Sequence, residues 1–115
     1  LKLSGESFCS PGRFGIGVDE LRSIASEVVE ASRLGAQIAI VVGGGNLIRG
    51  AELASAGHIH QATADHMGML GTVINALALK EMLKKLGAEC RVMSAIEIRA
   101  VAEPFIRGRA LRHLE

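Results

Sequence analysis

Short apolar runs and longer amphipathic stretches alternate along the chain. Three short runs, at residues 1–4, 37–42 and 88–95, are predicted to be the strands of a parallel sheet, and the run at 37–42 is rich in β-branched residues. The run at 37–42 is continuous, which predicts a strand that is covered on both faces. The chain is therefore expected to begin with a strand and to return to strand structure twice.

Helical spacing of apolar residues fills the segments between these runs. One helix is predicted to begin at an Asp19 N-cap and to end near Gly35. A longer helix is predicted to begin at a Thr63 N-cap and to stop at Gly87. Two further helical segments are predicted at residues 47–56 and 106–114.

The order of these elements predicts an α/β fold. Strand, helix, strand, helix and strand in succession favour three αβα layers, with a mainly parallel sheet, right-handed crossovers and helices on both faces. Residues 5–17 hold four of the 14 glycines and a proline, which predicts a loop. The last helix ends without a cap, and such a helix normally returns the chain to another parallel strand, so the pattern indicates the front part of a larger fold.

Composition narrows the class of protein. The 115 residues include 49% hydrophobic residues but no Trp or Tyr, so one domain with an aliphatic core is expected. Thirteen Lys and Arg against twelve Asp and Glu leave a net charge of +1, which provides no broad basic surface for nucleic acid. Cys9 and Cys90 fit no metal or redox spacing. Without a membrane-spanning run or signal peptide, we expect a cytoplasmic protein that does not bind membranes.

The sequence IAIVVGGGNLIRG, residues 38–50, places three glycines directly after the second strand. Ligands of open parallel sheets bind beyond the carboxyl ends of the strands. Glycine N–H groups can converge there on an anion, and Arg49 is placed to form a charge-assisted hydrogen bond to phosphate. The alternative is a plain turn beside a solvated arginine. Neither the P-loop nor the dinucleotide-binding glycine pattern is present.

Two other residues are candidates at the same edge of the sheet. Lys2, on the first strand next to Ser4 and Gly5, is the candidate catalytic cation, although a lone strand lysine is more often solvated. Asp65 is predicted in the first turn of the long helix, near the ligand edge. Its alternative role is that of a charge partner for the helix dipole.

The long helix also holds residues that need an explanation. Gly68 and Gly71 each cost up to about 1 kcal/mol relative to Ala in a helix, so we expect close packing against a ligand or another subunit. His58, His60 and His66 suggest a metal site only weakly, because no Cys or carboxylate completes a tetrahedral set at suitable spacing. No protein metal site is therefore predicted.

Four segments, LKLSGES, VVGGGNLIRG, DHMGMLGTVINALAL and VMSAIEI, together resemble the bacterial-type UMP kinases (uridylate kinases) of the amino acid kinase family. The first segment and the GGG turn are shared with carbamate and acetylglutamate kinases, whereas GGGNLIRG followed by DHMGMLGT is more specific. The resemblance spans the whole chain but only the first half or so of the family's length. It implies that residues 1–115 form the N-terminal, nucleotide-monophosphate-binding part of an amino acid kinase domain, incomplete at its C-terminus.

This resemblance implies phosphoryl transfer from ATP to UMP, giving ADP and UDP, in a homohexamer with Mg²⁺ accompanying ATP. No acidic cluster in the sequence clearly supplies ligands for Mg²⁺. The resemblance implies catalytic roles for Lys2 and Arg49, and UMP contacts for Gly44 and for Asp65 through the ribose. The implied ATP-binding residues are Lys2, Leu3, Ser4, Gly5, Gly45 and Arg49. The segment that matches a region linked to activation by GTP comprises Ser10, Pro11, Gly12, Arg13, Phe14 and Gly15, and UTP is the implied inhibitor.

Two alternatives stay open. Another enzyme of the amino acid kinase family could act on a carbamate or an acylamino acid, although DHMGM argues against it. A non-catalytic module for nucleotide binding or oligomerisation could retain only the front half of the fold.

Overall fold

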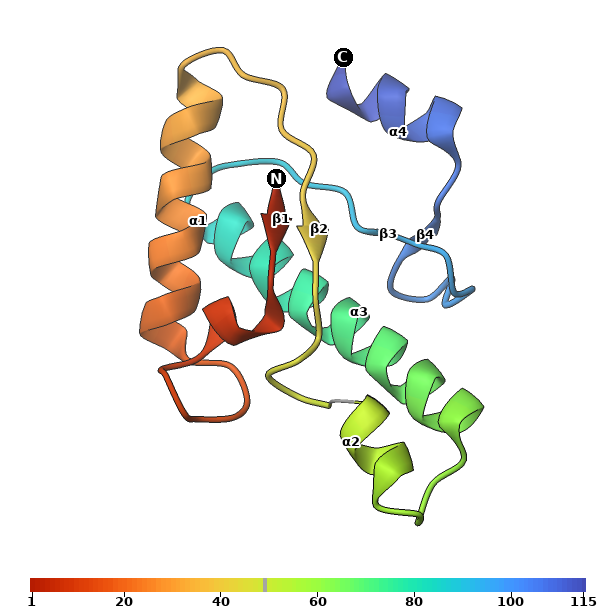
Figure 1. Ribbon diagram of the computed structural model, residues 1–115. Helices are drawn as coiled ribbons and strands as arrows, with labels where there is room; N and C mark the ends of the chain where they lie inside the picture. Colours follow the sequence, from red (N-terminus) through yellow and green to blue (C-terminus); the bar gives the residue numbers. More distant parts are fainter. Residues whose placement is uncertain (49) are drawn as a thin grey trace.

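The structure is a computed structural model that describes residues 1–48 and 50–115, and it combines helices with short parallel strands (Figure 1). In chain order the elements are β1 (Lys2–Leu3), the 3-10 helix η1 (Gly5–Phe8), α1 (Val18–Arg33), β2 (Val41–Val42), α2 (Gly50–Ser55), α3 (Gln61–Lys85), β3 (Met93–Ser94), β4 (Glu103–Pro104) and α4 (Arg107–Leu114). The predicted loop at 5–17 thus contains one short helix, and β4 was not predicted.

Strands β1 and β2 lie side by side and parallel (Figure 1). Lys2 is opposite Val41, and Leu3 is opposite Val42. The N–H group of Gly43 donates a hydrogen bond to the carbonyl oxygen of Leu3 at 2.8 Å, so the pairing continues past the end of β2. Since side chains alternate along a strand, Leu3 and Val42 share one face and Lys2 and Val41 the other.

The second strand is shorter than the predicted 37–42 because β1 offers few partners. The amino group of Leu1 donates to the carbonyl oxygen of Ala39 at 2.9 Å, and residues before Ala39 have no partner residue in β1. Ile40 packs against the core, whereas Val41 is 67% exposed. The prediction that both faces of this strand are covered is therefore wrong at Val41.

The core forms where α1 and α3 pack together on the face of β1 and β2 that carries Leu3 and Val42. Its buried apolar side chains come from η1, α1 and α3, with Leu3, Ile40 and Val42 packed against them. They are Phe8, Leu21, Ala25, Val29, Leu79, Met82 and Leu83. The core is aliphatic apart from one phenylalanine, as the composition predicts.

The predicted glycines end α1 and α3, but the predicted N-cap residues do not begin them. Gly35 and Gly87 have φ angles of +92° and +87°, the left-handed conformation that ends helices and that glycine adopts without strain. At the other ends, Gly17 rather than Asp19 is the N-cap of α1. His60 rather than Thr63 caps α3, because its ring nitrogen Nδ1 accepts a hydrogen bond from the N–H group of Ala62.

The third predicted strand pairs with β4 and not with β2, so the strands form two parallel pairs. Glu103 and Phe105 donate to the carbonyl oxygens of Val92 and Ser94, both at 2.9 Å. These bonds straddle Pro104, which has no N–H group to donate and therefore does not interrupt the ladder. Proline is depleted in strands, so the sequence gives no strong signal for β4.

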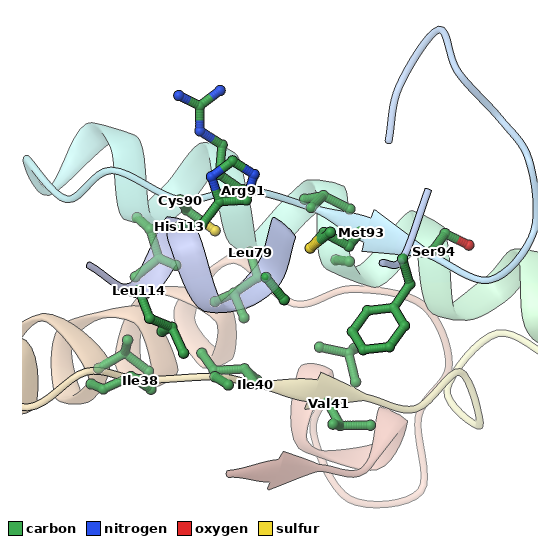
Figure 2. Close-up of a pocket in the computed structure, with 18 of the residues that line it drawn as sticks. Ile38, Ile40, Val41, Leu79, Cys90, Arg91, Met93, Ser94, His113 and Leu114 are labelled. Carbon is green, nitrogen blue, oxygen red and sulfur yellow. The ribbon is translucent and has the colours of Figure 1, made fainter. Parts of the chain in front are cut away.

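An apolar groove with a volume of ≈ 920 Å³ lies between residues 36–42 and 88–96 (Figure 2). Helix α3 contributes Leu79 to its lining and α4 contributes Leu114. Cys90 lines this groove, and burial raises the pKa of its thiol while the Lys80 charge opposes the shift. Among the described helices, none has the length and apolar character needed to cross a membrane.

Candidate functional site

The carboxyl ends of β1 and β2 meet at one edge of the strand pair. A Cβ atom placed on Gly43 would lie 3.0 Å from the backbone nitrogen of Gly5. A Cβ atom on Gly5 would clash with the backbone nitrogen of Gly45 and lie 2.6 Å from Oδ1 of Asn46. The Ser4–Gly5 segment and the glycine turn, residues 43–46, therefore touch backbone to backbone, as expected from parallel strands.

Gly44 also has to be glycine, because it packs against α3. It is buried, and a Cβ atom there would lie 2.9 Å from the carbonyl oxygen of Gly68 and 3.0 Å from the nitrogen of Thr72, both in the α3 backbone. Gly71 faces Gly44 at ordinary contact distance, whereas a Cβ atom on Gly68 would meet nothing within 4 Å. The close packing expected at Gly71 is thus made with the chain's own glycine turn rather than with a ligand or another subunit, whereas the position of a side chain at Gly68 is open space.

The glycine turn continues into a helical turn. The N–H groups of Leu47 and Ile48 both donate to the carbonyl oxygen of Gly44, at 3.0 and 3.1 Å. Helix α2 begins at Gly50, three residues later than predicted. Arg49, the predicted phosphate-binding cation, lies outside the described residues.

Lys2 is exposed, on the face of β1 opposite to Leu3 and the core. Ser4, which ends the strand, is also exposed, and its hydroxyl oxygen lies 3.3 Å from that of Ser7. The structure therefore places the predicted segment Lys2 to Gly5 at the same edge as Gly45. The side chains of Lys2 and Ser4 can therefore approach a ligand without any movement of the core.

Asp65 lies one residue beyond the first turn of α3, because the helix begins at Gln61 and not at Thr63. It is exposed and accepts a hydrogen bond from Nε2 of Gln61 at 2.7 Å. Asp65 lies three residues, about one helical turn, before Gly68, whose carbonyl oxygen would meet a Cβ atom on Gly44. Since the dipole effect falls off within the first turn, this position weakens the alternative role of a dipole partner.

The segment Ser10–Gly15 forms a loop between η1 and α1. The N–H group of Arg13 donates to the carbonyl oxygen of Ser10 at 3.0 Å, while Phe14 is exposed. The Ser10 hydroxyl donates a hydrogen bond to Glu20, and this bond is the main cause that lowers the pKa of the Glu20 carboxyl. The backbone of Glu20 and the charge of Arg13 lower this pKa further.

Sequence reasoning missed two residues of this region, Asn46 and Asn75. They are the only asparagines of the chain, and their side chains are 2% and 0% exposed. Their amide groups hydrogen-bond to each other at 2.6 and 3.1 Å, beneath the glycine turn. The signal was present in the sequence: Asn75 stands between Ile74 and Ala76 in the middle of an apolar helix, where asparagine is a poor helix former.

The apolar groove is not the predicted site. Its lining contains none of residues 43–46, and it approaches the glycine turn through Val42, which precedes Gly43, and Thr72, which faces Gly44. Within residues 1–48 and 50–115, no group of three His, Cys, Asp or Glu side chains could hold a metal ion.

Comparisons with known proteins agree on a family. The family model described as "Amino acid kinase family" matches residues 1–113. The uridylate kinase of Xanthomonas axonopodis pv. citri is 57% identical over all 115 residues, which cover 48% of that protein. The uridylate kinase of Rubrobacter xylanophilus is also 57% identical over the whole chain, which covers 45% of it. The chain thus spans about half the length of the curated relatives that it matches.

Solved structures agree as well. The UMP kinase of Bacillus anthracis has a TM-score of 0.90 and 41% identity, over 98% of this chain and 46% of that one. The UMP kinase of Ureaplasma parvum has a TM-score of 0.86 and 27% identity, over 99% of this chain and 49% of that one. These similarities confirm the predicted α/β fold class. The chain belongs to the amino acid kinase family.

Proposed function

We propose that the chain supplies the N-terminal, nucleotide-monophosphate-binding part of a kinase that transfers the γ-phosphate of ATP to UMP, giving UDP and ADP. The observation that carries this proposal is the backbone contact between the Ser4–Gly5 segment and the glycine turn at the carboxyl ends of β1 and β2. The chain as a whole is 57% identical to two uridylate kinases. Carbamate or acylamino-acid kinase activity is disfavoured, because the relatives reported above are uridylate or UMP kinases.

In the proposal, the two segments of this contact together hold the two nucleotides. Lys2 neutralises charge on the transferring phosphoryl group, and the backbone from Leu3 to Gly5 and at Gly45 holds the phosphates of ATP. Gly44 contacts UMP through its peptide group, because it has no side chain. Arg49 belongs to the proposal on sequence grounds alone, as a second cation for the ATP phosphates.

Phosphoryl transfer suits a site of this composition. The transition state needs little covalent help from the protein, so positioning of the two reactants and neutralisation of charge supply most of the rate increase. Glycine backbone on two adjacent segments allows two phosphate groups to approach each other closely. Lys2, exposed at the same edge, supplies positive charge.

Mg²⁺ accompanying ATP is part of the proposal. The described residues contain no group of three His, Cys, Asp or Glu side chains that could hold a metal ion. We therefore assign no step of the reaction to the metal.

The remaining partners are proposals too. Self-association is supported by the exposed apolar side chains of Leu70 and Ile74 on α3, and the homohexamer as its form rests on the sequence resemblance. GTP as an activator that involves Ser10–Gly15, UTP as an inhibitor, and a cytoplasmic location rest on the sequence resemblance.

Asp65 provides the test, because a carboxylate can accept hydrogen bonds from both ribose hydroxyls of UMP. In the full-length protein that contains this chain, Asp65→Asn should weaken UMP binding by about 1.5–3 kcal/mol, roughly 10- to 150-fold in Kd, the range for a hydrogen bond to a charged group. ATP affinity should stay unchanged. Calorimetric titration of each nucleotide separately measures both.

Glu81→Gln is the matched control, since Glu81 is an exposed carboxylate on the same helix. It should change neither affinity. Unchanged UMP affinity in Asp65→Asn with a lower melting temperature would assign Asp65 a structural role. Failure of the unmodified protein to bind or phosphorylate UMP would reject the proposed function.

A further inference from the structure

The amide groups of Asn46 and Asn75 use their full capacity to donate hydrogen bonds. Nδ2 of Asn75 donates to Oδ1 of Asn46 at 2.6 Å and to the carbonyl oxygen of Gly43 at 2.8 Å. Nδ2 of Asn46 donates to Oδ1 of Asn75 at 3.1 Å and to the carbonyl oxygen of Gly15 at 2.8 Å. Each side-chain nitrogen carries two hydrogens, so all four hydrogens have an acceptor.

This pair has only one arrangement that satisfies its surroundings. The carbonyl oxygens of Gly43 and Gly15 can accept hydrogen bonds but cannot donate them. Rotating either amide by 180° would place an amide oxygen against one of these carbonyl oxygens and leave a buried N–H group without a partner. Because an unsatisfied buried polar group is costly, the pair behaves as a single fixed unit.

The pair connects three segments that are distant in the sequence. Asn75 belongs to α3, while Gly43 and Asn46 are the first and last residues of the glycine turn. The N–H group of Gly15 donates to the backbone oxygen of Asn46 at 2.9 Å, so two hydrogen bonds join the end of the loop Ser10–Gly15 to the turn. A displacement of this loop is therefore transmitted through these two hydrogen bonds to Asn46, the last residue of the turn.

We propose that Asn75 is a positioning residue for the glycine turn and that, together with Asn46, it couples the loop Ser10–Gly15 to that turn. This inference rests on the proposed function, in which the turn contacts the nucleotide phosphates. Glycines do not restrict their own backbone, so the direction of their N–H groups has to be set by neighbouring residues. Asn75 sets it from the rigid helix, and the coupling makes nucleotide affinity depend on the conformation of the loop.

Amide hydrogen exchange of the ligand-free, full-length protein tests the structural part without any nucleotide. Asn75→Ala should make exchange about tenfold faster at residues 43–48 and at Gly15, the size expected for the loss of one net hydrogen bond. The matched control is Leu79→Ala, four residues further along α3 and buried in the core between α1 and α3. It should speed exchange in α1 and α3 and leave Gly15 and the turn as they are.

Unchanged exchange at Gly15 in Asn75→Ala, or an equal increase there in Leu79→Ala, would overturn the inference. If Asn75→Ala does not fold, Asn75→Ser replaces it, because a hydroxyl can still donate one of the two bonds. Asn75→Ser should then show the same pattern of faster exchange with a smaller amplitude, and exchange identical to that of the unmodified protein would also overturn the inference.

Nucleotide binding tests the consequence for the site. Asn46→Ala, Asn75→Ala and the double variant should each raise the Kd for ATP by about tenfold. The double variant should be no worse than either single one, because the two residues act as one unit. Leu79→Ala should bind ATP normally while melting at a lower temperature. Independent, additive effects, or normal ATP affinity in all three asparagine variants, would reject the coupling.

The two proposals fail in different ways. If the unmodified full-length protein binds neither ATP nor UMP, the proposed function is wrong, and the exchange measurement still decides whether Asn75 positions the turn. If the unmodified protein binds both nucleotides and the asparagine variants bind them equally well, the function stands and this inference falls.

Discussion

The two sides of β2 differ in their backbone hydrogen bonds and in how completely their apolar side chains are covered. On the side of β1, backbone hydrogen bonds continue from Ala39 to Gly43, and helices α1 and α3 cover the apolar face. On the other side, the groove separates residues 36–42 from residues 88–96, and large apolar side chains such as Phe105 and Leu111 remain exposed. All site residues that the structure describes lie on the first side or on α3.

This difference agrees with the proposed role of the glycine turn in positioning phosphate groups. Preorganised donors are effective only if the surrounding structure fixes their position to within about 0.5 Å. The glycine turn is held by β1, by the α3 backbone and by the asparagine pair. The groove side has no comparable set of contacts among the described residues, so changes there should affect the site less.

The largest effect is expected on turnover. Lys2→Ala in the full-length protein should lower kcat by about 10³-fold, since a cation at a phosphoryl-transfer site contributes at least this much. Lys84→Ala, an exposed lysine at the far end of α3, is the matched control and should leave kcat unchanged. Steady-state assays of UDP formation measure both, and near-normal kcat in Lys2→Ala would remove this residue from the site.

The two sides of β2 should also differ in how much a buried or exposed leucine contributes to the free energy of unfolding. Leu79→Ala removes a side chain that is 3% exposed and should lower the free energy of unfolding by about 2–5 kcal/mol. Leu111→Ala makes the same change at a side chain that is 47% exposed, and it should cost less than about 1 kcal/mol. Urea unfolding of both variants provides the measurement. Similar losses would mean that the two sides are packed equally well.

Two glycine variants probe the contact between the turn and α3. Gly44→Ala should destabilise the protein by about 1–3 kcal/mol, because the new methyl group meets the α3 backbone. Gly68→Ala has open space and should stabilise the protein by up to about 1 kcal/mol through its better helix propensity. Thermal melting distinguishes them, and a tolerated Gly44→Ala would show that the turn can move away from the helix.

The smallest effect concerns the loop that is joined to the turn. The Ser10 hydroxyl lowers the pKa of Glu20 in the folded protein, so this hydrogen bond stabilises the fold above the ordinary carboxyl pKa. The stabilisation is lost as the pH falls through the lowered pKa. Ser10→Ala should raise the pKa of Glu20 in an NMR titration and reduce stability at neutral but not at acid pH. An unchanged pKa would show that Ser10 does not hold Glu20.

Local rules predicted the helices well. Apolar spacing identified α1 and α3, and Gly35 and Gly87 end them with positive φ angles as predicted. The features that were not predicted depend on the choice of helix cap or on contacts between residues that are distant in the sequence. Gly17 and His60 cap helices without a strong sequence preference, and β4 exists because two hydrogen bonds straddle Pro104.

The candidate site divides in the same way. Parallel strands place their carboxyl ends together, so the meeting of Gly5 with the glycine turn could be predicted from the sequence. The hydrogen bonds between Asn46 and Asn75 could not, because the two residues are 29 positions apart and no local pattern links them. The contact of Gly44 with Gly68 and Thr72 likewise depends on how α3 crosses the strands.

The register of β1 and β2 makes this edge sensitive to chain length as well as to residue type. Lys2 faces away from the core only because Leu3, its neighbour, pairs with Val42 on the other face. Inserting or deleting one residue between Lys2 and Gly5 would exchange the two faces and turn a lysine towards the core. The exposed Ser4 can be substituted without loss of this geometry, whereas Gly5 admits no side chain and the length of the segment cannot change by one residue.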